Sequence, residues 1–200
     1  MAMIRKNEIK NILRALVIAD TAPQINIPET LRMESIDVFI SLGDLLPVDF
    51  KGLDTVNNVP KIGVRGNHDS IDYMPMFGIK NLHLKSYTLR GVSFAGFEGC
   101  VKYKNTAVEP LYTQEEAYEL IKLLPKADVI ITHCPPRGVN DHKGPHQGWD
   151  ALRKYVVENK PKLLMHGHTY PNENCLITKY CCTEIEYVRG YKIIDIAVSV

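Results

Sequence analysis

The chain has 200 residues, of which 45% are hydrophobic and 24% charged, so it can bury one substantial core and we expect a single domain over residues 1–200. The formal net charge of +1 does not predict a polyanion partner, and nucleic acid, although possible as a substrate, is not indicated. No apolar run is long enough to cross a membrane, and charges interrupt the apolar residues near the N-terminus where a signal peptide would need a continuous core. Residues 1–10 are a candidate N-terminal extension.

Buried strands and helices alternate in the first half of the predicted structure. Apolar, β-branched runs predict strands at 13–19, 38–42 and 62–64. A short helix is expected between the first two strands, at 28–35. A hairpin is expected at 87–97, with Arg90-Gly91 at its turn.

The second half begins in the same way and then changes character. A capping box at Thr113 and Glu116 starts a helix, and a further helix at 149–159 is closed by Lys160-Pro161. Strands are expected on either side of this second helix, at 129–132 and 163–165. Beyond them, successive antiparallel strands are expected at 175–179, 183–188 and 191–198, the last two joined by Arg189-Gly190. Alternating and then consecutive strands predict an α/β fold of two packed sheets with helices outside.

The five cysteines are odd in number, include a vicinal pair and show no C-x-x-C spacing. They do not form the regular framework that is typical of disulfide-rich secreted proteins. Reduced thiols are the usual state in the cytoplasm, and we therefore predict a cytoplasmic protein.

Four short segments place possible metal ligands at the ends of predicted strands. They are Gly43-Asp44, Gly66-Asn67-His68-Asp69, His133 and Gly167-His168. Together they offer one carboxylate, one amide oxygen and two imidazoles, which suits a divalent ion that must also bind a phosphate and activate water. Gly43-Asp44 alone is more typical of a turn and His133 alone of a buried histidine, whereas Gly66-Asn67-His68-Asp69 is more informative because three polar side chains crowd one turn. Their joint occurrence at four strand ends favours a metal site.

His68 suits a different part of the same chemistry. A hydrolytic metal centre also needs an acid that is not a ligand and can protonate the leaving oxygen, and imidazoles titrate near neutral pH. His68 lies next to the candidate ligand Asn67, and Asp69 is a candidate to orient its ring. We therefore predict His68 and Asp69 as catalytic residues.

These segments resemble the motifs of the calcineurin-like metallophosphoesterases, which run Asp-x-His, Gly-Asp, Gly-Asn-His-Asp/Glu, a lone His and Gly-His-x-His. The resemblance covers about residues 13–170 and begins at Asp20-Thr21-Ala22. It implies a four-layer α-β-β-α sandwich, in which two mixed sheets pack face to face between flanking helices. It also implies hydrolysis of phosphoesters by a metal-activated water, in a groove at the carboxyl ends of the strands.

Two positions depart from the family motifs, and both departures affect the same metal ion. Ala22 and Tyr170 stand where the family has histidines that help to hold the first of two ions. That first site would retain only Asp20 and the shared Asp44. The ligands that the resemblance implies for the second ion are all present: Asp44, Asn67, His133 and His168. We expect one well-formed site for a divalent metal, Mn²⁺ before Fe, Zn, Ni or Mg, and a second site that is weak or empty.

His166 leaves a second interpretation of this region open. His166-Gly167-His168 also has the His-x-His spacing, and sliding the motif back would restore both imidazoles while placing Met165 at the family's glycine. In a milder version His166 is an additional ligand or supports one, because it lies on the same side of an extended segment as His168. The alternative is a structural histidine that is hydrogen bonded at the strand end.

Three further side chains are candidates for binding the substrate. Arg65 precedes Gly66, and Arg137 begins the long polar loop 137–150, so either guanidinium could meet a phosphate. Tyr170 could hydrogen-bond the substrate in place of the lost ligand. For the two arginines, ordinary solvated side chains are the alternative.

The sequence therefore predicts a metal-dependent hydrolase for phosphodiester or phosphomonoester bonds of a small or nucleotide-like substrate. The alternative is a phosphoesterase fold of low or no activity that acts as a binding or scaffolding module. His68 favours the enzyme, because a scaffold has no need of a non-ligand acid, whereas Ala22 and Tyr170 favour the scaffold. If hydrolysis occurs, we expect low turnover or a requirement for a high Mn²⁺ concentration.

Overall fold

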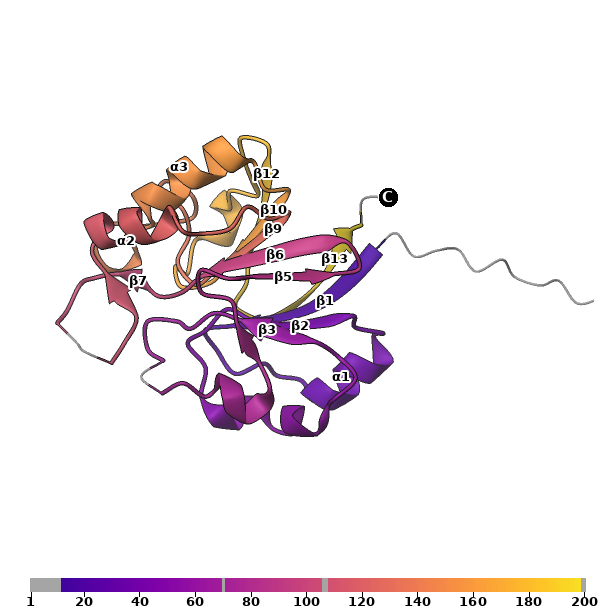
Figure 1. The fold of residues 1–200 in the computed structure, drawn as a ribbon. Coiled ribbons are helices and arrows are strands. Elements are labelled where there is room, and N and C mark those ends of the chain that lie inside the picture. Colours follow the sequence, from indigo (N-terminus) through magenta and orange to yellow (C-terminus); the bar gives the residue numbers. More distant parts are fainter. Residues whose placement is uncertain (1–11, 70, 106–107, 199–200) are drawn as a thin grey trace, which may run out of the picture.

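Two β-sheets packed face to face form the centre of the molecule, with helices on their outer sides (Figure 1). The computed structural model describes residues 12–198 except 70, 106 and 107, so the candidate extension at residues 1–10 lies outside the described residues. The helix-sheet-sheet-helix order confirms the predicted four-layer α/β architecture. Among the described residues, no helix combines the length and the apolar character that crossing a membrane requires.

The first sheet has the strand order β13-β1-β2-β3-β4. Its strands are β1 (Ile12–Ala19), β2 (Val38–Ser41), β3 (Lys61–Gly63), β4 (Lys80–Asn81) and β13 (Gly190–Ala197). The first four are parallel and β13 is antiparallel to β1 at the edge. Its outer face is covered by α1 (Ile27–Met33) and the 3₁₀ helices η1 (Pro47–Phe50), η2 (Leu53–Thr55) and η3 (Met74–Phe77).

The second sheet has the strand order β11-β12-β10-β9-β6-β5. Its strands are β5 (Ser86–Leu89), β6 (Val92–Phe97), β9 (Val129–Thr132), β10 (Leu163–His166), β11 (Lys179–Tyr180) and β12 (Thr183–Tyr187). The four central strands are parallel, and β5 and β11 are antiparallel edges. Its outer face is covered by α2 (Gln114–Ile121) and α3 (Asp150–Asn159). The remaining elements are β7 (Cys100–Val101), β8 (Leu111–Tyr112), η4 (Gly144–His146) and η5 (Glu173–Cys175).

Alternating side chains of the strands fill separate apolar layers. In β1, Leu13 and Val17 face the second sheet, whereas Leu16 and Ile18 face the layer that contains α1. A parallel strand that is covered on both faces needs apolar residues at almost every position, which is why every residue of β1 except Arg14 is apolar. The two faces together fix the position of β1, and therefore the position of the residue that follows it.

The C-terminal strands differ from the prediction of successive antiparallel strands. β12 runs parallel to β10 in the second sheet, whereas β13 crosses over and pairs with β1 in the first. The expected strand at 175–179 is replaced by η5 and the short β11. The apolar residues explain the division, because Ile185 packs beneath the helices of the second sheet and Ile194 packs between the two sheets. Gly190, with φ +71°, therefore belongs to a crossover between sheets and not to a hairpin turn.

Candidate metal centre

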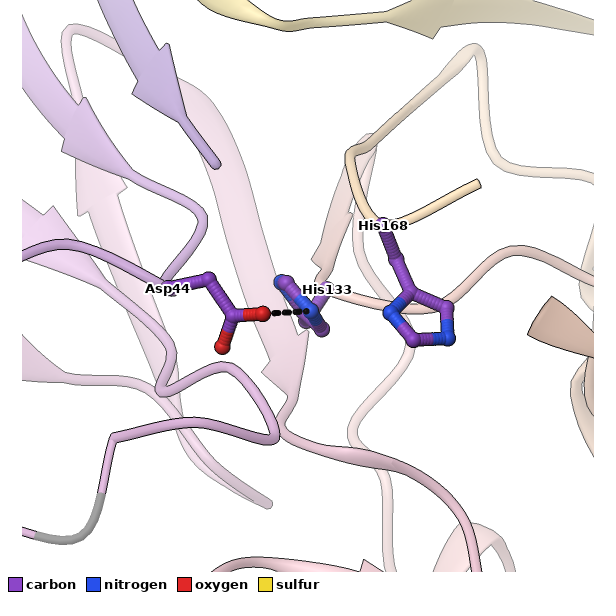
Figure 2. Close-up of side chains that lie close together, drawn as sticks. All are labelled: Asp44, His133 and His168. Carbon is purple, nitrogen blue, oxygen red and sulfur yellow. Dashed lines mark ion pairs between the residues drawn. The ribbon is translucent and has the colours of Figure 1, made fainter. Parts of the chain in front are cut away.

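Asp44, His133 and His168 form the centre of the candidate site (Figure 2). Each offers one ligand atom, and these atoms all lie within 4.8 Å of one another. His133 Nε2 is 3.3 Å from Asp44 Oδ2 and 2.9 Å from Asn67 Oδ1. The segments after β2, β3, β9 and β10 thus bring together the four residues that the sequence predicts as one set of metal ligands.

Backbone carbonyls fix the orientation of both imidazoles. His133 Nδ1 lies 2.8 Å from the carbonyl oxygen of Leu42, and His168 Nε2 lies 2.9 Å from that of Pro145. A carbonyl only accepts hydrogen bonds, so each of these nitrogens carries a ring hydrogen, and the other nitrogen of each ring is the one that can bind an ion. Such outer hydrogen bonds are typical of metal-ligating histidines. With one carboxylate and one amide oxygen beside them, the donors fit a divalent cation.

Opposite charges dominate the electrostatics of the cluster. Burial by itself lowers the pKa of His133, but the charge and hydrogen bond of Asp44, together with Asp20, outweigh it and raise this pKa to about 9. Burial would raise the pKa of Asp44, yet His133 and the backbone N–H of His68 lower it to about 2. Burial and repulsion from His133 lower the pKa of His168 to about 3. Without an ion, His133 therefore holds a proton that a cation between these atoms would displace.

Asp20 lies beside this cluster at the end of β1. Its two carboxylate oxygens accept the backbone N–H of His168, at 3.1 and 2.9 Å, and its Oδ1 is 4.0 Å from His133 Nδ1. Burial raises the pKa of Asp20 to about 6, although His133 and the N–H of His168 oppose the rise. In the conformation described, Asp20 positions the backbone of His168, and its predicted role as a metal ligand stays a prediction.

Several residues of the site have an unusual backbone conformation. Asp20, Asp44, His168 and Tyr170 have φ values of +63°, +56°, +72° and +43°, in the left-handed region. A side chain other than glycine there costs about 1 kcal/mol or more, so the surrounding structure must hold it in place. These four are among only ten non-glycine residues with positive φ in the described part of the chain. Their grouping around one cluster indicates a functional constraint.

Gly43 and Gly66 allow two ligand loops to meet backbone to backbone. Gly43 has φ +94°, and a Cβ on it would lie 2.0 Å from the backbone nitrogen of Gly66. A Cβ on Gly66 would lie 2.1 Å from Asp44 Oδ1. Only residues without a side chain fit at these two points. The two glycines therefore explain why each precedes a predicted ligand in the sequence.

Asp69 joins the same two loops, which corrects its predicted role. Its carboxylate accepts the backbone N–H groups of Asp44 at 3.1 Å, Leu45 at 3.3 Å and Gly66 at 2.7 Å. Within the described residues it makes no hydrogen bond to His68, whose own backbone N–H donates to Asp44 Oδ1 at 2.7 Å. Asp69 therefore positions the ligand loops and does not orient the imidazole of His68.

Replacement of Gly66 by alanine is expected to open the site. The added methyl would force the loop of Asn67 away from Asp44, so we expect Mn²⁺ affinity to fall at least about tenfold, as for the loss of a group that supports metal ligands. Isothermal titration with Mn²⁺ measures this. Gly91→Ala is the control for replacing a glycine away from the site, because no atom lies within 4 Å of the new Cβ. Equal effects of the two variants on Mn²⁺ affinity would contradict the close approach.

His166 does not belong to the cluster, which corrects its prediction as a ligand. Its Nε2 accepts from Asn140 Nδ2 at 3.1 Å and its Nδ1 lies 2.9 Å from the carbonyl oxygen of Gly167. Burial lowers its pKa to about 4, so the ring is neutral. Both nitrogens are engaged, and no lone pair is left for an ion. The structural alternative describes His166, and His168 takes the ligand position without a shift of the motif.

The three predicted substrate contacts have different surroundings. Arg65 donates to both carboxylate oxygens of Glu98, at 2.9 Å each, and its predicted contact with a phosphate stays a prediction. Arg137 is 3.3 Å from Asp150 Oδ2 in an exposed pair. Tyr170 is 44% exposed and lies against His146, whose ring centroid is in turn 5.1 Å from that of His168. Tyr170 is thus the one of the three that the described contacts connect to the cluster.

Sequence reasoning missed Tyr103 as a support for the site. Asn67 Nδ2 donates to the hydroxyl of Tyr103 at 3.3 Å, which leaves Asn67 Oδ1 facing His133. Tyr103 lies in a polar segment without regular pattern, so no local signal could have identified it. Its role depends entirely on the tertiary contact.

Comparison with known proteins places the chain in a family. The model of the calcineurin-like phosphoesterases matches residues 7–172, and no curated protein matches the chain. One similar solved structure has 15% sequence identity and a TM-score of 0.64, covering 94% of this chain and all of the other. Protein TT1561 of Thermus thermophilus has 14% identity and a TM-score of 0.58, with 94% and 100% coverage. These structures share the fold, and the family model spans well over half of the chain, which therefore belongs to the calcineurin-like phosphoesterases, a family of metal-dependent phosphoester hydrolases.

Proposed function

We propose that this protein hydrolyses phosphodiester or phosphomonoester bonds of small or nucleotide-like substrates with a single divalent ion. Mn²⁺ is the ion that we propose before Fe, Zn, Ni or Mg. The ion would be held by Asp44, Asn67, His133 and His168. One observation carries this proposal, namely that ligand atoms of Asp44, His133 and His168 lie within 4.8 Å of one another. Family membership supplies the reaction class, and the substrate and the metal are the proposed part.

The residues of the site would have different roles in this reaction. When bound, a divalent ion polarises a phosphoryl oxygen and makes water nucleophilic near neutral pH. The carboxylate of Asp44 would balance part of the positive charge. The carbonyls of Leu42 and Pro145 fix the two rings so that the other nitrogen of each could bind the ion, once His133 has lost its second proton. The leaving oxygen then needs a proton from a group outside the ligand set.

His68 is the residue that we propose as this acid. Its side chain is exposed, whereas Asn67 and the two ligand histidines are buried, so its ring is accessible to a substrate. The hydrogen bond from its backbone N–H to Asp44 Oδ1 keeps it next to the cluster. An imidazole in this position can donate its proton to the leaving oxygen and recover it from water.

The competing proposal is a protein that binds phosphate compounds without hydrolysing them. It is favoured by Ala22 and Tyr170, which remove two imidazoles from the family's first metal site. The retained His68 argues against it. We also propose a cytoplasmic location and one domain over residues 1–200, in keeping with five cysteines that are all free thiols.

Hydrolysis of a generic aryl phosphodiester and of the matching monoester distinguishes the two proposals. Purified protein freed of metal would be assayed while Mn²⁺ is added back, and product would be followed by absorbance. An enzyme gives a rate that rises and saturates as Mn²⁺ binds. A binding module gives saturable Mn²⁺ binding with no hydrolysis above that of free Mn²⁺, and this result would exclude the enzymatic proposal for both ester types.

A further inference from the structure

Arg189 lies at the end of the first sheet, near the positions where the two histidine ligands of the family's first metal ion are missing. In the pairing of β1 with β13, Ala19 is opposite Gly190, so the next residues outward, Asp20 and Arg189, are neighbours at the sheet end. A Cβ on Gly190 would be only 3.6 Å from the hydroxyl oxygen of Thr21. The crossover from β12 to β13 thus brings an arginine beside the first motif.

Tyr170 holds the guanidinium on the side of the second lost ligand. Arg189 Cζ lies 4.7 Å from the ring centroid of Tyr170, which is a cation–π contact. The ring of Tyr170 also contacts His146, with centroids 5.8 Å apart, and the ring of His146 in turn contacts that of His168. Tyr170 occupies the position of the last histidine of the Gly-His-x-His motif. The arginine is therefore next to Asp20 in the sheet register and in contact with the residue at a position where the family has a metal ligand.

The charge of Arg189 acts on the site and is not neutralised by a direct partner. Burial raises the pKa of Asp20 and the pKa of Tyr170, and the positive charge of Arg189 opposes part of each rise. Arg189 is exposed, and within residues 12–198, apart from the three that are not described, no carboxylate forms an ion pair with it. Its fork of N–H donors is therefore available to an anion.

We propose that Arg189, held on Tyr170, binds the substrate phosphate in place of the family's first metal ion. This inference rests on the proposed function and assigns it a phosphate-binding residue. A guanidinium offers two parallel N–H donors to two phosphate oxygens, and it carries permanent positive charge where a second divalent ion would lack imidazole ligands. The site would then consist of one ion and one arginine, with the phosphate between them.

Binding of inorganic phosphate to the Mn²⁺-loaded protein tests this assignment. Removal of a charge-assisted, bidentate contact is expected to weaken phosphate binding about tenfold or more in Arg189→Ala and Arg189→Gln, the second of which keeps the stem of the side chain. The number of Mn²⁺ ions bound should stay the same. Isothermal titration calorimetry gives both quantities, and far-UV circular dichroism checks that the variants are folded.

Arg153→Ala is the matched control, because Arg153 is an exposed arginine that also lies over a tyrosine ring, that of Tyr180 at 5.9 Å, on α3. It should bind phosphate as the wild type does. Wild-type phosphate affinity in either folded Arg189 variant, or an equal loss in Arg153→Ala, would overturn the assignment. If Mn²⁺ binds and esters are hydrolysed while Arg189 proves dispensable, only this inference fails. If the wild type neither binds Mn²⁺ nor hydrolyses esters, the proposed function fails with it.

Discussion

Asparagine in place of Asp44 is expected to remove Mn²⁺ binding and, with it, hydrolysis. The substitution keeps the size of the side chain but takes away the one carboxylate within the cluster, which faces His133 at 3.3 Å. Loss of a group that merely supports a ligand typically lowers metal affinity about 10–100-fold, so we expect loss of the charged ligand to cost more than about 100-fold. Calorimetric titration with Mn²⁺ and the aryl phosphodiester assay measure the two effects.

Asp49→Asn provides the control for that substitution. Asp49 also accepts a backbone N–H, that of Leu46 at 2.8 Å, but it is not part of the cluster. This variant should bind Mn²⁺ and hydrolyse the diester as the wild type does. Asp44→Asn with wild-type Mn²⁺ affinity would exclude Asp44 as a ligand.

Alanine in place of His68 is expected to separate metal binding from catalysis. The ring is exposed and lies outside the group of ligand atoms, so Mn²⁺ affinity should not change. General acid catalysis typically contributes about 10²–10⁴-fold, and we expect a loss in this range for an ester with an alkoxide leaving group. The loss should be smaller for a nitrophenyl ester, because nitrophenolate leaves without a proton. Rates for the two esters, compared within one preparation, measure this difference.

His142→Ala controls for the removal of any exposed imidazole near the site, because His142 lies in the loop 137–150 and is exposed. Its rates should equal those of the wild type. A uniform loss for both leaving groups in His68→Ala, or a fall in its Mn²⁺ affinity, would contradict the role of His68 as an acid and indicate a structural or ligand role instead.

The convergence of the ligands could be predicted because strand ends carry them. β1, β2, β3, β9 and β10 were all predicted from apolar runs, and parallel strands within a sheet place their carboxyl ends at one edge. The short segment after each strand is therefore placed by the strand itself. The motif glycines add local evidence, since Gly43 and Gly66 are needed where two backbones touch.

Features that depend on tertiary pairing could not be predicted. The crossover between β12 and β13 exists because β12 pairs with β10 in the second sheet and β13 pairs with β1 in the first. A pattern of apolar residues does not specify which strand a given strand pairs with. The spacing of His166 and His168 predicts that they share a side of an extended segment, but His168 has a left-handed φ, and only its ring lies in the cluster, whereas His166 is hydrogen bonded to Asn140. Arg189 has no motif of its own and is brought to the site by that crossover.

Electron paramagnetic resonance of the protein during titration with Mn²⁺ tests most directly whether one cation binds between Asp44, His133 and His168. We predict the spectrum of an isolated protein-bound Mn²⁺ that reaches its maximum at one ion per chain and is absent in Asp44→Asn. A spin-coupled pair at two ions per chain would show that the first site is functional despite Ala22 and Tyr170. A spectrum of free Mn²⁺ throughout would show that these side chains do not form a metal site.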